Sequence, residues 1–296
     1  MLPTDMITLN VGGVRYIANV DILIRENDTF FAALFSGRWQ LKQDPNDNSV
    51  FIDGDGELFK HILEYFRTNS VFSDIMTNES LLRRLIREAD YFCIENLFYI
   101  LTEAERKLQE EEEERLAIER TFPNGTLLRA EHTVKLNEFY GNINQRWKLI
   151  YKATCDGFDA NAFHSHCNNK GPTMTIIQSN TNYIFGGYTS ASWTSSQRWQ
   201  NDERAFLFTL TNPHNIPPTK YTIRSDRAVN AIYDSSDYGP TFGAGCDIGI
   251  HNTSNSNYSN YTYFPLSYDD TTGKGNNTFT GANCFTTSEI EVFKLA

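Results

Sequence analysis

The stretch TLNVGGVRY, residues 8–16, places two adjacent glycines between two short runs of apolar and β-branched residues. Apolar side chains alternate on both sides of the pair, at Ile7, Leu9, Val11, Val14 and Tyr16. This is the period of half-buried strands, and a Gly-Gly pair between two strands predicts a tight hairpin turn whose central residues have positive φ. A phosphate-binding loop would instead need a helix directly after the glycines. Because a second strand follows, we favour the hairpin.

The rest of the first hundred residues reads as one more strand followed by two amphipathic helices. Residues 50–52 (VFI) predict the strand, and residues 53–56 (DGDG) predict a turn. Apolar residues then recur at helical spacing, first at Leu58, Phe59, Ile62, Leu63 and Phe66, and later at Leu81, Leu82, Leu85, Ile86 and Ala89. Strands first and helices afterwards indicate an α+β domain.

Three strings in this order, LNVGGVRY, FIDGDGELFKHILEYFR and READYFCIENL, resemble the BTB/POZ-type tetramerisation domain of potassium channels and of the KCTD proteins. The resemblance covers residues 5–100 and implies association of four or five identical chains. It implies an oligomerisation motif at Gly12, Gly13, Phe51, Asp53, Asp55, Phe59, Arg67 and Glu88. This region has one cysteine, Cys93, and one histidine, His61. We therefore expect no zinc between subunits, because a closed structural site takes four ligands.

The charge of the first half constrains how such chains could associate. Residues 1–121 carry 13 Lys and Arg against 23 Asp and Glu, whereas the formal net charge of the whole chain is -11. Acidic chains repel one another unless basic and acidic patches interleave. The candidates for pairing between chains are Arg83, Arg84 and Arg87 on one side and Asp53, Asp55 and Glu57 on the other. An oligomer held by such pairs is expected to loosen at high salt, because salt screens them.

Residues 101–121 are predicted to form an acidic helical linker. Seven positions follow coiled-coil spacing, and five of them are apolar: Leu97, Leu101, Ala104, Leu108, Glu111, Arg115 and Ile118. The repeat breaks at Glu111 and Arg115, and residues 110–114 are all glutamate. A solvated spacer helix is therefore favoured over a coiled coil, and the Pro-Asn-Gly at residues 123–125 ends it.

The C-terminal part changes to short β-rich runs separated by Gly, Pro, Asn and Ser, namely WKLIYKA, TMTIIQ, NYIFGGYTS, AFLFTL, YTYFPL and IEVFKL. Several short strands with frequent turn signals predict a β-sandwich or barrel. One short helix interrupts them, with Asp159 as its N-cap and with Ala160, Phe163 and Cys167 on one face.

No cluster of residues in this half predicts catalysis or metal binding. His164 and His166 would point about 200° apart on a helix, so they and Cys167 do not converge on one metal. Catalysis by scattered acids remains an alternative for Asp226, Asp234, Asp237 and Asp247, but these four are interpreted as solvated turn residues. We expect no catalytic residue, no metal and no cofactor. A reactive thiol at Cys155, Cys167, Cys246 or Cys284 is the less favoured alternative, because no CxxC pair or basic neighbour would lower its pKa.

The order of LIYKATCDGFDANAFHSHCNNKGPTMTIIQS, IFGGYTSASW, AFLFTLTNP, GPTFGAGCDIGI and SEIEVFKL resembles a TLDc domain over residues 122–296. The resemblance implies a β-sandwich flanked by helices. Proteins of that family are linked to oxidative-stress resistance and to the vacuolar proton-pumping ATPase, and the family implies no agreed set of catalytic residues.

The two resemblances together predict a non-enzymatic adaptor that forms homo-oligomers and presents several TLDc-like domains. It would be a substrate adaptor that binds a cullin of a cullin-RING ubiquitin ligase. Alternatively, it would regulate the vacuolar proton pump by binding its subunits, or regulate the oxidative-stress response. The acidic net charge argues against nucleic acid. No run approaches the roughly 20 apolar residues of a membrane span, and no signal core follows the N-terminus. We therefore expect a cytoplasmic protein, which also suits five scattered cysteines.

Overall fold

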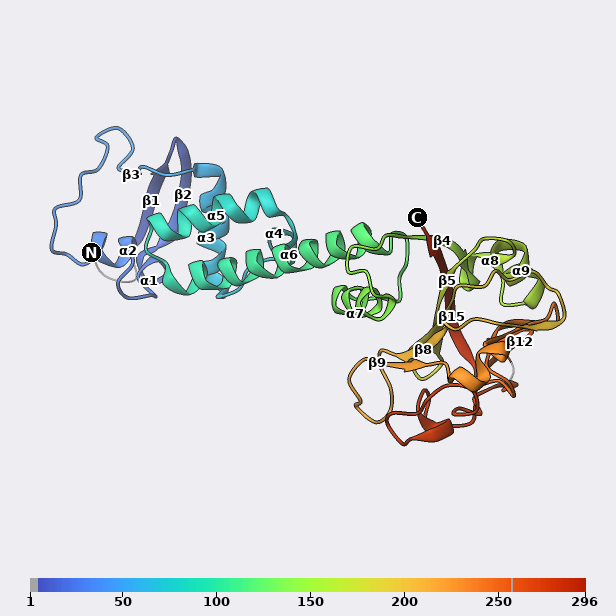
Figure 1. Cartoon of the computed structure of the whole chain (residues 1–296). Helices are drawn as coiled ribbons and strands as arrows, with labels where there is room; N and C mark the ends of the chain where they lie inside the picture. Colours follow the sequence, from blue (N-terminus) through green and yellow to red (C-terminus); the bar gives the residue numbers. More distant parts are fainter. Residues whose placement is uncertain (1–4, 257) are drawn as a thin grey trace. The chain divides into compact units, whose positions relative to one another are not determined.

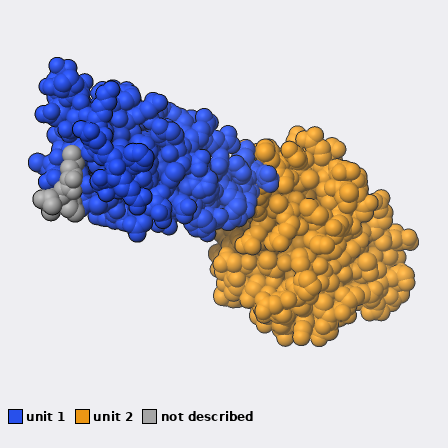
Figure 2. Space-filling model, turned by 90° about the vertical axis from the view of Figure 1, so that its left-hand side faces the viewer, with its two compact units in different colours: residues 1–113 blue, residues 114–296 orange. Residues whose placement is uncertain are grey.

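The computed structural model of the chain describes residues 5–256 and 258–296. The chain divides into two compact units, Met1–Glu113 and Glu114–Ala296 (Figure 2). One continuous helix, α6 (Glu95–Thr121), contributes residues to both. No helix in the described ranges is both long enough and apolar enough to cross a membrane.

The first unit is built on a three-stranded sheet with the order β2-β1-β3 (Figure 1). Its strands are β1 (Met6–Val11), β2 (Val14–Asn19) and β3 (Val50–Ile52). β1 pairs antiparallel with β2 so that Val11 lies opposite Val14, and it pairs parallel with β3. Gly12 and Gly13 form the two-residue turn with φ of +53° and +94°. The predicted hairpin is confirmed.

Helices follow the hairpin and bury one face of the sheet. They are α1 (Val20–Leu23), α2 (Phe30–Leu34), α3 (Gly56–Thr68), α4 (Ser73–Thr77), α5 (Glu79–Tyr91) and α6. Asp55 is the N-cap of α3, where its Oδ1 accepts the backbone N–H groups of Glu57 and Leu58 at 3.0 and 3.3 Å. The α+β class and both amphipathic helices are thus confirmed.

The first part of α6 belongs to the core of the first unit. Leu97 and Leu101 are fully buried there, and Ala104 and Leu108 pack against the same cluster, whereas residues 109–116 are exposed. The predicted linker helix exists, but a solvated spacer beginning at residue 101 is wrong, because its apolar positions cover the first core. Whether the exposed part pairs in a coiled coil stays a prediction.

The second unit contains two six-stranded sheets, with the orders β4-β15-β5-β6-β8-β9 and β14-β13-β12-β11-β10-β7. The strands of the first sheet are β4 (Trp147–Lys152), β5 (Thr173–Ser179), β6 (Ile184–Thr189), β8 (Phe206–Thr209), β9 (Thr219–Thr222) and β15 (Thr287–Leu295). Those of the second are β7 (Arg198–Gln200), β10 (Ile232–Asp234), β11 (Tyr238–Phe242), β12 (Ile248–His251), β13 (Asn260–Tyr261) and β14 (Cys284–Phe285).

One hydrophobic core joins these two sheets into the predicted sandwich. It contains Ile177 and Leu207 from the first sheet and Ile232 and Ile248 from the second. A further cluster buries the other face of the first sheet beneath residues 122–136 and includes Phe122 and Leu136. The first sheet is therefore buried on both faces, whereas the second is buried on one.

Short helical segments complete the unit: α7 (Ala130–Tyr140), α8 (Ala153–Asp156), α9 (Ala160–Cys167) and the 3-10 turns η1 (Ser225–Asn230) and η2 (Gly275–Asn277). The Asp159 cap of α9 is confirmed by its hydrogen bond from Ala162 N at 2.9 Å. Two expectations differ from the structure. The sequence did not predict α7. Of the strand expected at YTYFPL, residues 261–266, only Tyr261 lies in β13 (Asn260–Tyr261), and Pro265 lacks the N–H that would let a ladder extend to the end of this run.

Candidate functional site

The outer face of the three-stranded sheet carries three large apolar side chains. Met6 on β1 is 75% exposed, Ile17 on β2 is 63% exposed and Phe51 on β3 is 64% exposed. Their immediate neighbours along the strands, such as Ile7, Ala18 and Ile52, are buried in the first core. Several large apolar side chains exposed on one face of a sheet are unusual on a monomeric protein and mark interaction surfaces.

The strand register places these side chains on one face. Ile17 lies opposite Thr8, and Phe51 lies beside Asn10, and both partners occupy outward positions of β1. We call the surface formed by Met6, Ile17 and Phe51 the open sheet face. The predicted motif includes Phe51 but not Met6 or Ile17. Ile17 could have been found, because the alternation of the hairpin predicts a polar residue at its position.

The glycine turn is locked against the turn that precedes α3. Gly12 N–H donates to Ile52 O at 3.1 Å, and a Cβ on Gly12 would lie 2.3 Å from Gly54 O. Glu88 Oε2 accepts the N–H of Asp55 at 3.3 Å, and burial raises the pKa of Glu88. Gly12, Asp55 and Glu88 thus lie close together, and their contacts fix the hairpin to the start of α3 and to α5.

The arginines expected to pair between chains are engaged within their own chain. Arg84 Nη2 donates to Asp55 Oδ2 at 2.7 Å, and this hydrogen bond lowers the pKa of Asp55. Arg83 pairs with Glu79 at 2.6 Å and with Glu105 at 2.8 Å. Helix packing thus gives Arg83 and Arg84 acidic partners within their own chain. Whether they also pair with acids of a neighbouring chain stays a prediction.

The remaining motif residues lie apart from one another. Phe59 is fully buried, with its ring centroid 5.1 Å from that of Tyr16, so it stabilises the core. Arg67 and Asp53 are exposed, and Arg67 Nη2 donates to Ile17 O at 3.5 Å. The structure brings part of the predicted motif to the glycine turn and leaves Phe51 on the open sheet face. Their common role in oligomerisation stays a prediction.

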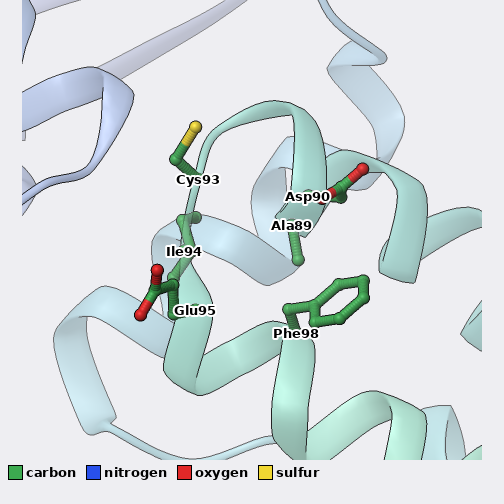
Figure 3. Close-up of a pocket in the computed structure, with 6 residues that line it drawn as sticks. All are labelled: Ala89, Asp90, Cys93, Ile94, Glu95 and Phe98. Carbon is green, nitrogen blue, oxygen red and sulfur yellow. The ribbon is translucent and has the colours of Figure 1, made fainter.

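A pocket of about 420 Å³ lies where α5 turns into α6. Its walls are Ala89, Asp90, Cys93, Ile94, Glu95 and Phe98. Figure 3 shows the Phe98 ring on the side of Ala89 and Asp90, with Cys93 and Glu95 on the other side. The pocket is a shallow surface feature with an apolar wall and two carboxylates at its rim. It offers room for a side chain of a partner.

The histidines of α9 contact different parts of the second unit. His164 is buried, and its Nε2 lies 2.8 Å from Ser235 O, whereas His166 Nδ1 lies 3.0 Å from Ile150 O. Burial raises the pKa of Cys167. Across residues 5–256 and 258–296, no three histidine, cysteine or acidic side chains form a group that could hold a metal ion.

Two of the four aspartates interpreted as solvated turn residues are fully buried. Asp247 Oδ1 accepts the N–H groups of Leu266 and Ser267, and burial raises the pKa of Asp247 to about 6. Asp234 accepts backbone N–H groups of Thr194, Ser195 and Ser196 at 2.9–3.1 Å. The solvated interpretation is wrong for these two, because each ties down a loop that is distant in sequence. Both are structural residues.

Replacing Asp234 by Ala is expected to lower the free energy of unfolding by about 2–4 kcal/mol, because three backbone N–H groups lose their acceptor. Urea unfolding measures the loss. Asp237→Ala is the matched control, since Asp237 is exposed three residues later, and its effect should stay within about 0.5 kcal/mol. Equal effects of both variants would contradict the anchoring role.

A comparison of the wild type with Asp234→Ala at different pH values tests the charge of Asp234. Burial alone would raise its pKa, but the hydrogen bonds from Thr194 and Ser196 outweigh burial and lower the pKa to about 2. A carboxyl whose pKa is lower in the folded state stabilises the fold above its ordinary pKa of 3.8, and this is lost as the pH falls toward 2. The stability gap between wild type and Asp234→Ala should therefore narrow below pH 4.

Comparison with known proteins matches both units. The sequence model of the TLDc domain matches residues 122–296, and that of the BTB/POZ domain matches residues 7–102. The chain is 28% identical over 219 residues to the human BTB/POZ domain-containing protein KCTD21, which covers 74% of this chain and 77% of that protein. It is 37% identical over 114 residues to the FH protein interacting protein FIP2 of Arabidopsis thaliana, covering 38% of this chain and 37% of that one. It is 33% identical over 66 residues to the mouse MTOR-associated protein MEAK7, covering 22% of this chain and 14% of that protein.

Proposed function

Because the chain belongs to the TLDc domain family and a BTB/POZ domain precedes its TLDc domain, we propose that it is a non-enzymatic adaptor. The first unit would assemble identical chains, and each assembly would present several copies of the second unit to protein partners.

The observation that carries this proposal is the open sheet face. Met6, Ile17 and Phe51 are each more than 60% exposed, and they share one side of the sheet. A domain of about 100 residues buries a limited share of its own surface, so association gains stability by covering such a face. A closed ring forms when this face meets a different surface of the next chain, because heterologous contacts then repeat until the ring closes.

Assembly would change how strongly the second unit binds. Linking several copies makes the second contact intramolecular, and avidity then exceeds the single affinity by a factor of roughly a hundred or more when geometry allows simultaneous contact. A partner that binds one copy weakly would be retained by four or five. This is the mechanism by which a chain without a catalytic site would act.

The partner candidates are a cullin, as for many BTB proteins, and subunits of the vacuolar proton-pumping ATPase or proteins of the oxidative-stress response. Affinity purification of the tagged full chain with mass spectrometry separates them. Cysteine-based redox catalysis is less well supported, because burial raises the pKa of Cys167 and of Cys246, whereas a nucleophilic thiol needs a lowered pKa.

Light scattering coupled to size exclusion tests the assembly. We expect the full chain to elute as four or five copies at tens of micromolar. A fragment of residues 114–296 is expected to be monomeric and to unfold cooperatively, because its hydrophobic clusters are complete within that range. A monomeric full chain would contradict the adaptor proposal, and an aggregating fragment would contradict an independent second unit.

A further inference from the structure

Six aromatic rings form a continuous row across the outer face of the second sheet of the sandwich. The row consists of Trp199, Tyr233, Tyr238, His251, Tyr261 and Tyr263, and we call it the aromatic row. Successive ring centroids are 4.6, 6.1, 4.7, 5.3 and 4.9 Å apart. Trp199 and Tyr263 are 37% and 49% exposed, and the four rings between them are partly exposed.

The strand register, and one irregularity in it, put these rings on the same side. Trp199 on β7 lies directly opposite Tyr233 on β10, while the flanking Ile232 and Asp234 are buried. On β11 the register shifts between Tyr238 and Thr241. Such a bulge changes the face to which a side chain points, and Tyr238 consequently lies opposite His251 in the row.

The aromatic row carries almost no charge. The six strands of its sheet hold two charged residues, Arg198 and Asp234, and Asp234 is fully buried. Burial lowers the pKa of His251 and so disfavours the charged form of its ring. Residues 122–296 carry 13 Lys and Arg against 14 Asp and Glu. A nucleic acid requires a positive surface, so the row suits an uncharged ligand.

Most polar groups of the aromatic row are hydrogen-bond donors, and several of them find no acceptor among the described residues. Tyr261 OH donates to Cys246 Sγ at 3.5 Å. Within the described part of the chain, Trp199 Nε1 and the hydroxyls of Tyr233, Tyr238 and Tyr263 have no hydrogen bond to protein. A fitting ligand therefore offers apolar rings for stacking and free acceptors for these donors.

We propose that the aromatic row binds a proline-rich segment of a partner protein in the polyproline II conformation. Such a segment has no internal hydrogen bonds, so all its carbonyls are free to accept, and aromatic surfaces are how proteins recognise it. Its turn of three residues advances roughly 9.3 Å, and two strand spacings amount to roughly 9.5 Å. A segment lying across the strands would thus bring every third residue onto every second ring.

This site is complete within one chain, so it does not depend on self-association. Three of the nine prolines lie within residues 213–218, but this segment connects β8 to β9 of the first sheet, where Asn212 Oδ1 accepts the N–H groups of His214 and Ile216. The occupant is therefore a segment of a partner.

Fluorine NMR of the full chain labelled with 5-fluorotryptophan tests the proposal, with decaproline as the probe. Of the four tryptophans, Trp147 and Trp193 are buried, whereas Trp39 is 71% exposed. Trp39 is an internal control, because residues 38–40 and 198–200 are both Arg-Trp-Gln. Trp39→Phe and Trp199→Phe assign the two exposed signals. We expect decaproline to shift the Trp199 signal saturably and to leave the Trp39 signal unchanged.

Variants then locate the site. Tyr233→Ala should weaken decaproline binding by about tenfold or more, the loss typical of an aromatic anchor. Tyr99→Ala is the control, since Tyr99 is 66% exposed on α6 and outside the row, and it should not change the affinity. If Tyr233→Ala unfolds the protein, the shift of the Trp199 signal in the wild-type chain still shows whether decaproline binds to the row. No shift at millimolar decaproline, an equal shift of Trp39, or a shift caused only by a neutral soluble polysaccharide would overturn the proposal.

Discussion

Replacing Phe51 by Glu is expected to convert the assembled chain into monomers, a four- to fivefold fall in the mass measured by light scattering. Phe51 is 64% exposed, so the change leaves the core of a single chain intact. In an assembly the same position would be covered, and an unpaired carboxylate there would lose its hydration without compensation. The variant should therefore keep its helix content while losing its partners.

Phe72→Glu is the matched control for this experiment. Phe72 is 57% exposed in the same unit but lies outside the sheet, at the N-cap of α4, and its variant should remain assembled. Ionic strength provides a second test. Arg83 and Arg84 are paired within their own chain, and the large exposed side chains of the open sheet face are Met6, Ile17 and Phe51, so the assembly should persist at high salt. Dissociation by salt with no effect of Phe51→Glu would place the contact elsewhere.

Gly12→Ala is expected to destabilise the first unit by roughly 3–4 kcal/mol. Two effects add. The residue would keep a φ of +53°, which costs an L residue about 1–2 kcal/mol, and its Cβ would lie 2.3 Å from Gly54 O. A backbone oxygen cannot move aside as a flexible side chain can, so the turn before α3 must shift. Chemical denaturation monitored by circular dichroism measures the loss.

Gly13→Ala separates the two effects. Gly13 also has positive φ, at +94°, but a Cβ there would meet no atom within 4 Å. Its loss should be about 1–2 kcal/mol, the cost of the backbone conformation alone. Neither variant is expected to change nucleotide binding, because no helix N-terminus follows the glycines. Equal losses for both variants would show that the contact with Gly54 does not matter.

The first unit was largely predictable because its signals are local. A Gly-Gly pair between alternating strands allows one short connection, and Asp55 ahead of an amphipathic run marks a helix start. What its sequence did not determine is which charged groups meet. Arg84 and Asp55 are 29 residues apart, and they approach only because α5 packs beside the start of α3.

The second unit was less predictable, because its chemistry depends on strand order. Asp234 looks like an ordinary turn residue in the sequence, and its partners at 194–196 lie about 40 residues earlier. The pairing of β10 with β7 brings them together and removes the carboxylate from water. A prediction from composition assigns aspartate to the surface, and it fails where a distant loop supplies enough N–H donors.

The class of each unit, the glycine hairpin, the Asp159 cap and the two family resemblances could be read from the sequence, because periodicity and turn chemistry act over a few neighbouring residues. Which surfaces remain open depends on tertiary packing. Met6, Ile17 and Phe51 share one face because three strands align. The aromatic row exists because a bulge and four strand pairings carry six rings from distant segments to one side of a sheet. Contacts between distant segments depend on strand order and register, and no short stretch of the sequence specifies either of them.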